Sequence, residues 1–266
     1  MIDLYDNFES FGATKLPGMT SLFRAACRRA AGLTVVSQAL DEYVAQYYQP
    51  TGLRQVIGNG VRRDLFFPRE RGEARAALGL PLSARLIGTA GAISAERGIS
   101  DLFEAFLRLA EQDDELWLIY AGPHDATPSR YPHPRIIDLG VLTLDRVSTL
   151  LSALDVAVVC NRDSDFGRYC FPLKLYEIIA CGVPLVAASL GDVREVLEPY
   201  PGSLYSPGDV SGLAAQIRRQ LAQPTPAAKS LAPSRRHWSN SLEGFIERVL
   251  ASVQTQGPRQ GRSRGC

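Results

Sequence analysis

Short apolar runs alternate with helical patterns between residues 54 and 222. The apolar runs predict strands at 55–57, 85–90, 116–121, 136–139, 156–160, 185–188 and 203–205. Between them, apolar residues recur with the period of a helix at 72–78, 99–111, 144–153, 172–181, 193–197 and 210–222. Strands that alternate with helices in this way predict an α/β fold with a doubly wound, Rossmann-like parallel sheet.

The first fifty residues show a shorter pattern. It predicts a strand end at 1–6, helices at 21–31 and 38–48, and a strand at 33–36. Because one or two strands do not make a stable sheet, we interpret 1–50 as the remnant of a second domain. The expected organisation is this remnant, a main domain at 51–224, a return segment at 225–253 with its helix from 238, and a disordered tail at 254–266.

Composition narrows the class of protein. The chain has 266 residues, of which 45% are hydrophobic, and its 29 basic side chains nearly cancel its 28 acidic ones. This balance argues against a nucleic-acid partner. Five cysteines without paired spacing suggest free thiols, and no signal peptide or membrane span is expected. We therefore expect a cytoplasmic protein, with peripheral contact at the inner membrane face through the basic helix 21–31 as an alternative to a solvated face.

The most informative stretch is Phe171-Pro-Leu-Lys-Leu-Tyr-Glu177, which begins the helix predicted at 172–181. Pro172 suits the first helical position, and Gly182 suits the stop. In an otherwise apolar helix only Lys174 and Glu177 are charged, and their spacing places them on one face. They are either an ion pair at the rim of the core or a pair of groups that meet a ligand at the carboxyl edge of the sheet.

A second informative loop is Gly91-Ala-Ile-Ser-Ala-Glu-Arg-Gly98, which joins a strand to an amphipathic helix. Backbone N–H groups in such a loop can hold phosphate, and Arg97 can add a bidentate contact. The alternative is that Arg97 is a solvated loop residue.

Both stretches resemble the donor site of nucleotide-sugar glycosyltransferases with the GT-B fold, in particular the retaining group called family 4. The likeness extends over Ala180-Cys-Gly-Val-Pro-Leu-Val-Ala187, Asn59-Gly60 and Ser206-Pro-Gly-Asp209, and covers roughly residues 33 to 222 in consistent order. Two positions depart from the family pattern. Tyr169 stands where the family has an acidic residue, and Ala92 stands where it has a cation.

The resemblance implies a site that binds a nucleotide-diphosphate sugar as substrate, with no cofactor and no metal. It implies that Arg97 and Lys174 contact the diphosphate and stabilise the leaving group, while Glu177 binds the ribose. Asp165 or Asp163 would reach the donor sugar in place of Tyr169, and main-chain groups near Val141 would read the base. The full set of expected donor-binding residues is Gly91, Arg97, Gly98, Val141, Asp165, Phe171, Pro172, Leu173, Lys174 and Glu177.

The implied activity is transfer of a sugar to an acceptor glycan or lipid-linked glycan. Because most of the acceptor-side domain of the family has no counterpart in this sequence, we expect the chain alone to bind nucleotide but to transfer sugar slowly, unless a separate chain supplies that domain. Two alternatives remain open. One is a non-catalytic nucleotide-sugar-binding module or a subunit of a split transferase, and the other is a GT-B-fold epimerase, for which His124 is the one plausible histidine.

Overall fold

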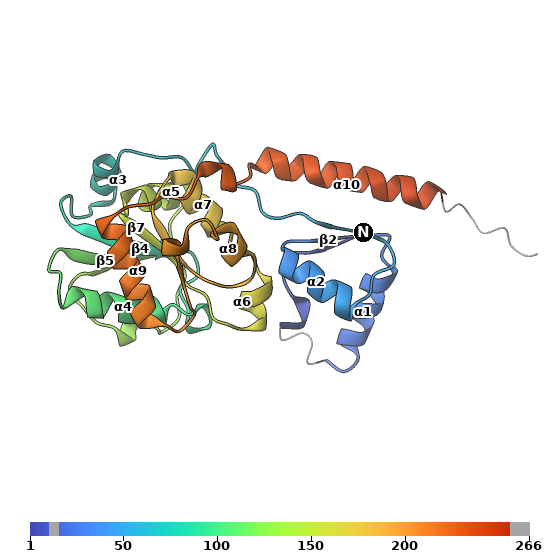
Figure 1. Ribbon diagram of the computed structural model, residues 1–266, viewed down its shortest axis with the longest axis horizontal. Coiled ribbons are helices and arrows are strands. Elements are labelled where there is room, and N and C mark those ends of the chain that lie inside the picture. The colour runs from blue at the N-terminus through green and yellow to red at the C-terminus, as the bar shows by residue number, and fades with distance from the viewer. Residues whose placement is uncertain (11–15, 256–266) are drawn as a thin grey trace, which may run out of the picture. The chain divides into compact units, whose positions relative to one another are not determined.

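The computed structural model describes residues 1–10 and 16–255, with the side chain of Ser10 left undescribed. These residues form two compact units (Figure 1), which are described separately. One unit is Asn59–Arg235, and the other combines Met1–Gly58 with the chain from Arg236 onward. Disorder is predicted for the tail at 254–266, of which residues 256–266 lie outside the described part of the chain.

The unit Asn59–Arg235 is built on a six-stranded parallel sheet with the order β6-β5-β4-β7-β8-β9. Its strands are β4 (Arg85–Ala90), β5 (Leu116–Ala121), β6 (Ile136–Asp138), β7 (Val156–Val159), β8 (Leu185–Ala188) and β9 (Leu204–Tyr205). The chain runs outward from β4 to β6 and then returns to the other side of β4 with β7. This order confirms the predicted doubly wound sheet and places its topological switch point between β4 and β7.

Helices cover both faces of this sheet (Figure 1). They are α3 (Arg71–Leu78), α4 (Ser100–Ala110), α5 (Leu144–Ala153), α6 (Asp165–Tyr169), α7 (Leu173–Cys181), α8 (Gly191–Val196) and α9 (Val210–Ala222), with 3-10 turns η3 (Ala95–Arg97), η4 (Pro128–Arg130), η5 (Pro201–Ser203) and η6 (Lys229–Leu231). The helices α4 and α9 pack on each other, as do α3 with α5 and α5 with α7. Phe103 and Phe106 of α4 are fully buried in the main core, where each such ring contributes about 1.5–3 kcal/mol.

The other unit contains a three-stranded parallel sheet in its described residues, with the order β1-β2-β3. The strands are β1 (Ile2–Leu4), β2 (Gly32–Val35) and β3 (Leu53–Val56), and the helices are η1 (Phe8–Ser10), α1 (Met19–Arg29), α2 (Gln38–Tyr47) and α10 (Arg235–Thr255). The strand predicted at 55–57 corresponds to β3. Its expected place in the main domain is wrong, because β3 pairs with β2 of the smaller unit. A local sequence pattern identifies a strand but not the strand with which it pairs. The boundary between the two units lies after residue 58, whereas the sequence pattern placed it after residue 50.

The helix α10 packs on this small sheet. Phe245 and Val249 form a core with Ile57, and a Cβ placed on Gly32 of β2 would stand 2.4 Å from a methyl carbon of Val249. Glycine is therefore required where the helix crosses the strand. The return helix predicted at 238–253 is present and completes the core of the unit that contains β1.

The chain passes between the two units twice, at Gly58–Asn59 and at Arg235–Arg236. Inside the larger unit the two connecting segments are joined by hydrogen bonds. The N–H of Val61 donates to Pro233 O at 2.8 Å, and the N–H of Arg235 donates to Val61 O at 3.0 Å. The Arg63 guanidinium adds a bond to Ala232 O at 2.7 Å. The larger unit therefore begins and ends at one place.

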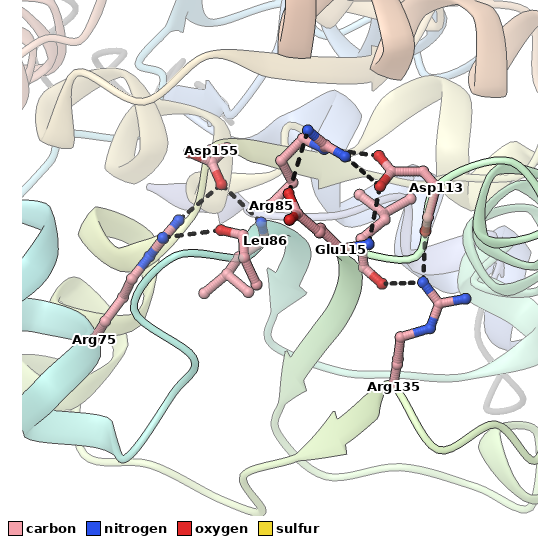
Figure 2. A network of polar contacts seen from close by, with 9 residues as sticks. Arg75, Arg85, Leu86, Asp113, Glu115, Arg135 and Asp155 are labelled. Atoms are coloured by element: carbon pink, nitrogen blue, oxygen red, sulfur yellow. Dashed lines mark hydrogen bonds and ion pairs between the residues drawn. The ribbon is translucent and has the colours of Figure 1, made fainter.

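A network of polar side chains lies at the amino-terminal edge of the larger sheet, where its strands begin (Figure 2). Arg75 of α3 is only 4% exposed and donates to the carbonyls of Ala153, Leu82 and Ala84 at 2.7–3.0 Å. Its Nη2 lies 2.7 Å from Asp155 Oδ2, which also accepts from the N–H of Leu86. This network ties α3 and the start of β7 to the start of β4.

No helix within residues 1–10 and 16–255 is long and apolar enough to cross a membrane. The four cysteines in these ranges, Cys27, Cys160, Cys170 and Cys181, are buried and form no disulfide, as expected for free thiols. Cys266 lies outside the described residues.

Candidate functional site

Three glycines follow neighbouring strands at the carboxyl edge of the larger sheet. Gly91, Gly122 and Gly140 come after β4, β5 and β6, and all have positive φ, of 108°, 135° and 64°. A Cβ on Gly122 would stand 2.0 Å from Gly91 O, so the two turns touch through bare backbone. The edge therefore exposes main-chain groups where an open α/β sheet binds its ligands.

The helix α7 begins at this edge, beside the switch point. It starts at Leu173, and Pro172 is its N-cap residue, one position before the predicted place. Pro172 offers no side-chain cap, and although the N–H of Leu175 donates to Pro172 O at 2.9 Å, the positive end of the helix dipole stays available to an anion. Asn59 Nδ2 donates to Phe171 O at 3.2 Å in a buried contact, which holds the loop before the helix. Gly182, with φ 71°, ends the helix as predicted.

Lys174 extends from α7 toward the loop after β4. A Cβ on Gly91 would lie 3.5 Å from Lys174 Nζ, which shows how closely the ammonium group covers this glycine. Burial lowers the pKa of Lys174, and the positive charge of Arg97 adds to that effect. Burial also raises the pKa of Glu177 to about 7, against the opposing influence of Lys174. Each of the two charges therefore favours the ionised form of the other, so both interpretations of the pair stay open.

Arg97 stands at the end of η3, in the same loop as Gly91. Its guanidinium carbon lies 4.2 Å from the centroid of the Phe166 ring, which belongs to α6. A Cβ on Gly98, which has φ 69°, would be 3.1 Å from the carbonyl carbon of Asn161, so the loops after β4 and β7 are in contact. The sequence pattern did not predict α6, and it gave no sign that Phe166 would meet Arg97.

The two acids expected to reach the donor sugar in place of Tyr169 lie on or beside α6. Asp165 is its first residue and is exposed, whereas Tyr169, its last residue, is half-buried. Arg168 forms an ion pair with Asp163 at 2.5 Å, and both side chains are more than half exposed. Asp163 is thus paired with Arg168 in the structure.

Val141 lies farther along the edge, after β6. It is 76% exposed and follows Gly140, whose O accepts from the N–H of Gly122 at 2.8 Å. Nearby, His124 Nε2 is 3.1 Å from Asp138 Oδ2, and this contact fixes the turn after β5. His124 is therefore a turn residue here, which leaves the epimerase alternative without a histidine at the switch point.

The structure brings together one part of the expected set. Gly91, Arg97, Gly98 and Lys174 meet where the loops after β4 and β7 touch, beside the segment Phe171–Pro172–Leu173 that opens α7. Glu177 lies one turn further along α7, while Val141 is two strands away and Asp165 is exposed on α6.

In the part of the chain that is described, no group of three or more His, Cys, Asp or Glu side chains could hold a metal ion.

Comparison with known protein families identifies the family of this chain. The sequence profile of the family described as "Glycosyl transferases group 1" matches residues 84–223, which is more than half of the chain. The chain belongs to this glycosyltransferase family. The resemblance inferred from the motifs is confirmed, and the match spans the strand–helix alternation from β4 to α9.

Curated relatives of this glycosyltransferase are longer than the chain. The N-acetyl-alpha-D-glucosaminyl L-malate synthase of Bacillus anthracis is 26% identical over 210 residues, which are 77% of this chain and 54% of the relative. A D-inositol 3-phosphate glycosyltransferase of Nocardiopsis dassonvillei is 26% identical in an alignment 266 positions long that covers 92% of this chain and 60% of the relative. The chain thus spans about half to three fifths of these proteins.

Solved glycosyltransferases share the fold. The sucrose-phosphate synthase of Thermosynechococcus elongatus superposes with a TM-score of 0.73 at 21% identity, covering 87% of this chain and 61% of that one. Anabaena HepE, solved in complex with UDP, gives 0.70 at 21% identity, covering 95% and 71%. These likenesses confirm the predicted α/β fold.

Glu177 predicts a pH dependence of stability. Its pKa rises from the usual 4.5 to about 7 on folding, so the folded protein binds this proton more tightly than the unfolded chain does. The stability that this proton contributes is complete below pH 4.5 and is lost as the pH rises through 7. Glu177→Gln should therefore flatten the fall in melting temperature between pH 5 and 7.5.

Differential scanning fluorimetry at several pH values would measure this, with Glu195→Gln, an exposed acid on α8, as the matched control. An unchanged slope in Glu177→Gln would contradict the raised pKa. The lowered pKa of Lys174 acts in the opposite sense, because its contribution grows as the pH rises through that pKa.

Proposed function

We propose that this chain binds a nucleoside-diphosphate sugar at the switch point between β4 and β7 and acts in transfer of that sugar to an acceptor. One observation carries the proposal. Lys174 covers the bare backbone of Gly91 beside the start of α7, and Arg97 of the same loop is close enough for its charge to act on Lys174. Two neighbouring cations beside the N-terminus of a helix suit a diphosphate.

The reaction follows from the same geometry. When the bond between the sugar and the diphosphate breaks, negative charge develops on the leaving phosphate oxygen. Arg97, Lys174 and the N–H groups at the start of α7 would stabilise that charge where it forms. Glu177, one turn along the helix, would accept hydrogen bonds from the ribose hydroxyls. Asp165 would face the donor sugar, and main-chain groups near Val141 would meet the base.

The nature of the donor and the acceptor is supported by relatives alone. HepE was solved with UDP and with UDP-glucose, which makes a uridine diphosphate the first probe to use. Relatives are named for malate, inositol 3-phosphate and 2-deoxystreptamine, so the acceptor differs among them. We propose a hydroxyl-bearing acceptor, such as a glycan.

Calorimetric titration with uridine, guanosine and adenosine diphosphates tests the proposal. One of them should bind with micromolar to millimolar affinity, equivalent to about 4–8 kcal/mol. Glu177→Ala should weaken that binding by about 1.5–3 kcal/mol, whereas affinity for inorganic pyrophosphate, which has no ribose, should stay the same. If none of the three nucleotides binds, the proposed function is wrong.

A further inference from the structure

The Arg97 side chain rests on the face of an aromatic ring. The guanidinium carbon is 4.2 Å from the centroid of Phe166, well within the distance at which a cation is attracted to a ring. The backbone N–H of Arg97 donates to Ser94 O at 3.0 Å, but within the described part of the chain the structure records no hydrogen bond or ion pair for its side chain. A contact between a cation and a ring face uses none of the N–H donors of the guanidinium. The ring therefore fixes the cation without occupying any of its donors.

Arg97 needs such support because its own loop gives little. It ends the 3-10 turn η3, and Gly98 follows in the left-handed region. A long side chain at this position can adopt many rotamers, and ordering it on binding costs free energy. Arg168 provides the contrast, since Asp163 holds it and also occupies its donors.

The short helix α6 is built so that it presents Phe166. Ser164 Oγ accepts from the N–H of Gly167 at 3.1 Å, which caps the helix, and Phe166 O accepts from the N–H of Cys170 at 3.0 Å, which closes it. A Cβ on Gly167 would stand 2.0 Å from Arg162 O, so this residue must be glycine for the turn to close. The position of the ring is thus set by the loop that follows β7.

We propose that Phe166 is a positioning residue that holds the Arg97 guanidinium ready for the diphosphate. The proposal rests on the proposed function, because it requires a diphosphate ligand. It predicts that loss of the ring weakens binding of a nucleoside diphosphate through Arg97 alone. It further predicts that binding of the nucleoside without phosphates does not change.

The test combines two ligands with a double-mutant cycle. UDP and uridine are titrated into the wild type, Phe166→Leu, Phe166→Tyr, Arg97→Met and the double variant Phe166→Leu/Arg97→Met. Phe166→Leu should weaken UDP binding by about 2- to 30-fold, the range expected for a cation–π contact, with uridine unaffected. Phe166→Tyr, which keeps the ring, should restore UDP binding. In the Arg97→Met background, Phe166→Leu should have no further effect.

A ligand-free measurement separates this inference from the proposed function. In the NMR spectrum of the free protein, the ring current of Phe166 should shift the Arg97 side-chain Nε–H resonance, and Phe166→Leu should abolish the shift. An unshifted resonance, or equal losses of UDP affinity with and without Arg97, would overturn the positioning role. If the resonance is shifted but the wild type binds no nucleotide, the proposed function is wrong, and the positioning role fails with it.

Discussion

Replacing Asp155 with alanine is expected to lower the free energy of unfolding of the unit 59–235 by about 3–5 kcal/mol. The change leaves the guanidinium of Arg75 buried with three carbonyl contacts and no counter-charge (Figure 2), and it removes the acceptor for the N–H of Leu86. Breaking one partner of a buried ion pair is costly because the other charge stays desolvated. Arg71, which also contacts Asp155, is half exposed and recovers solvation in water.

Urea denaturation followed by the fluorescence of Trp117 on β5 measures this effect. The chain has two tryptophans, so the background should carry Trp238→Phe to silence α10 in the other unit. Asp64→Ala is the matched control, because its ion pair with Arg62 is exposed on both sides and contributes little. A shift in Asp155→Ala no larger than in Asp64→Ala would contradict the structural role of the Arg75 network.

Replacing Lys174 with methionine is expected to weaken binding of UDP by roughly 10- to 150-fold, which corresponds to about 1.5–3 kcal/mol for a hydrogen bond to a charged group. Lys174 lies in the first turn of α7 and covers Gly91, which follows β4. The diphosphate is proposed to lie at this point. Methionine keeps most of the length of the side chain and its apolar contacts, so the change removes the charge with little loss of packing.

Parallel titrations with UDP and uridine distinguish a phosphate contact from damage to the fold. The uridine affinity should be the same in Lys174→Met and in the wild type. Lys229→Met, at an exposed position on η6, serves as the control for loss of a positive charge. Equal losses for UDP and uridine would indicate a folding defect, and unchanged UDP affinity would place the diphosphate elsewhere.

Elements bounded by clear local signals were predictable from the sequence. The strands β4, β5 and β8 have the predicted bounds, because each is a continuous apolar run between turn residues. The stop of α7 at Gly182 and the cap of α9, where Asp209 accepts from the N–H of Gly212, were also visible as residue types. The glycine and lysine of the site were expected from their motifs, although their contact was not.

Features that depend on distant segments were not predictable in this way. Just before β3, Gly52 passes close to the segment that leads into β2, since a Cβ there would stand 2.2 Å from Ala30 O. The helix α6 is too short to show a period, although Ser164 before Asp165 is a cap signal that could have revealed it. The stack of Phe166 on Arg97 joins two loops, and no local pattern reports such a pair.

The place where the chain enters and leaves the larger unit also sets an order for folding during synthesis. Residues 59–235 are one continuous stretch, so the ribosome completes them before Phe245 and Val249 have been made. The sheet of β1, β2 and β3 is translated early, but its core needs those two side chains of α10. Domains that emerge whole fold as units. The strands β1, β2 and β3 must therefore wait for α10, while the unit translated between them can fold first.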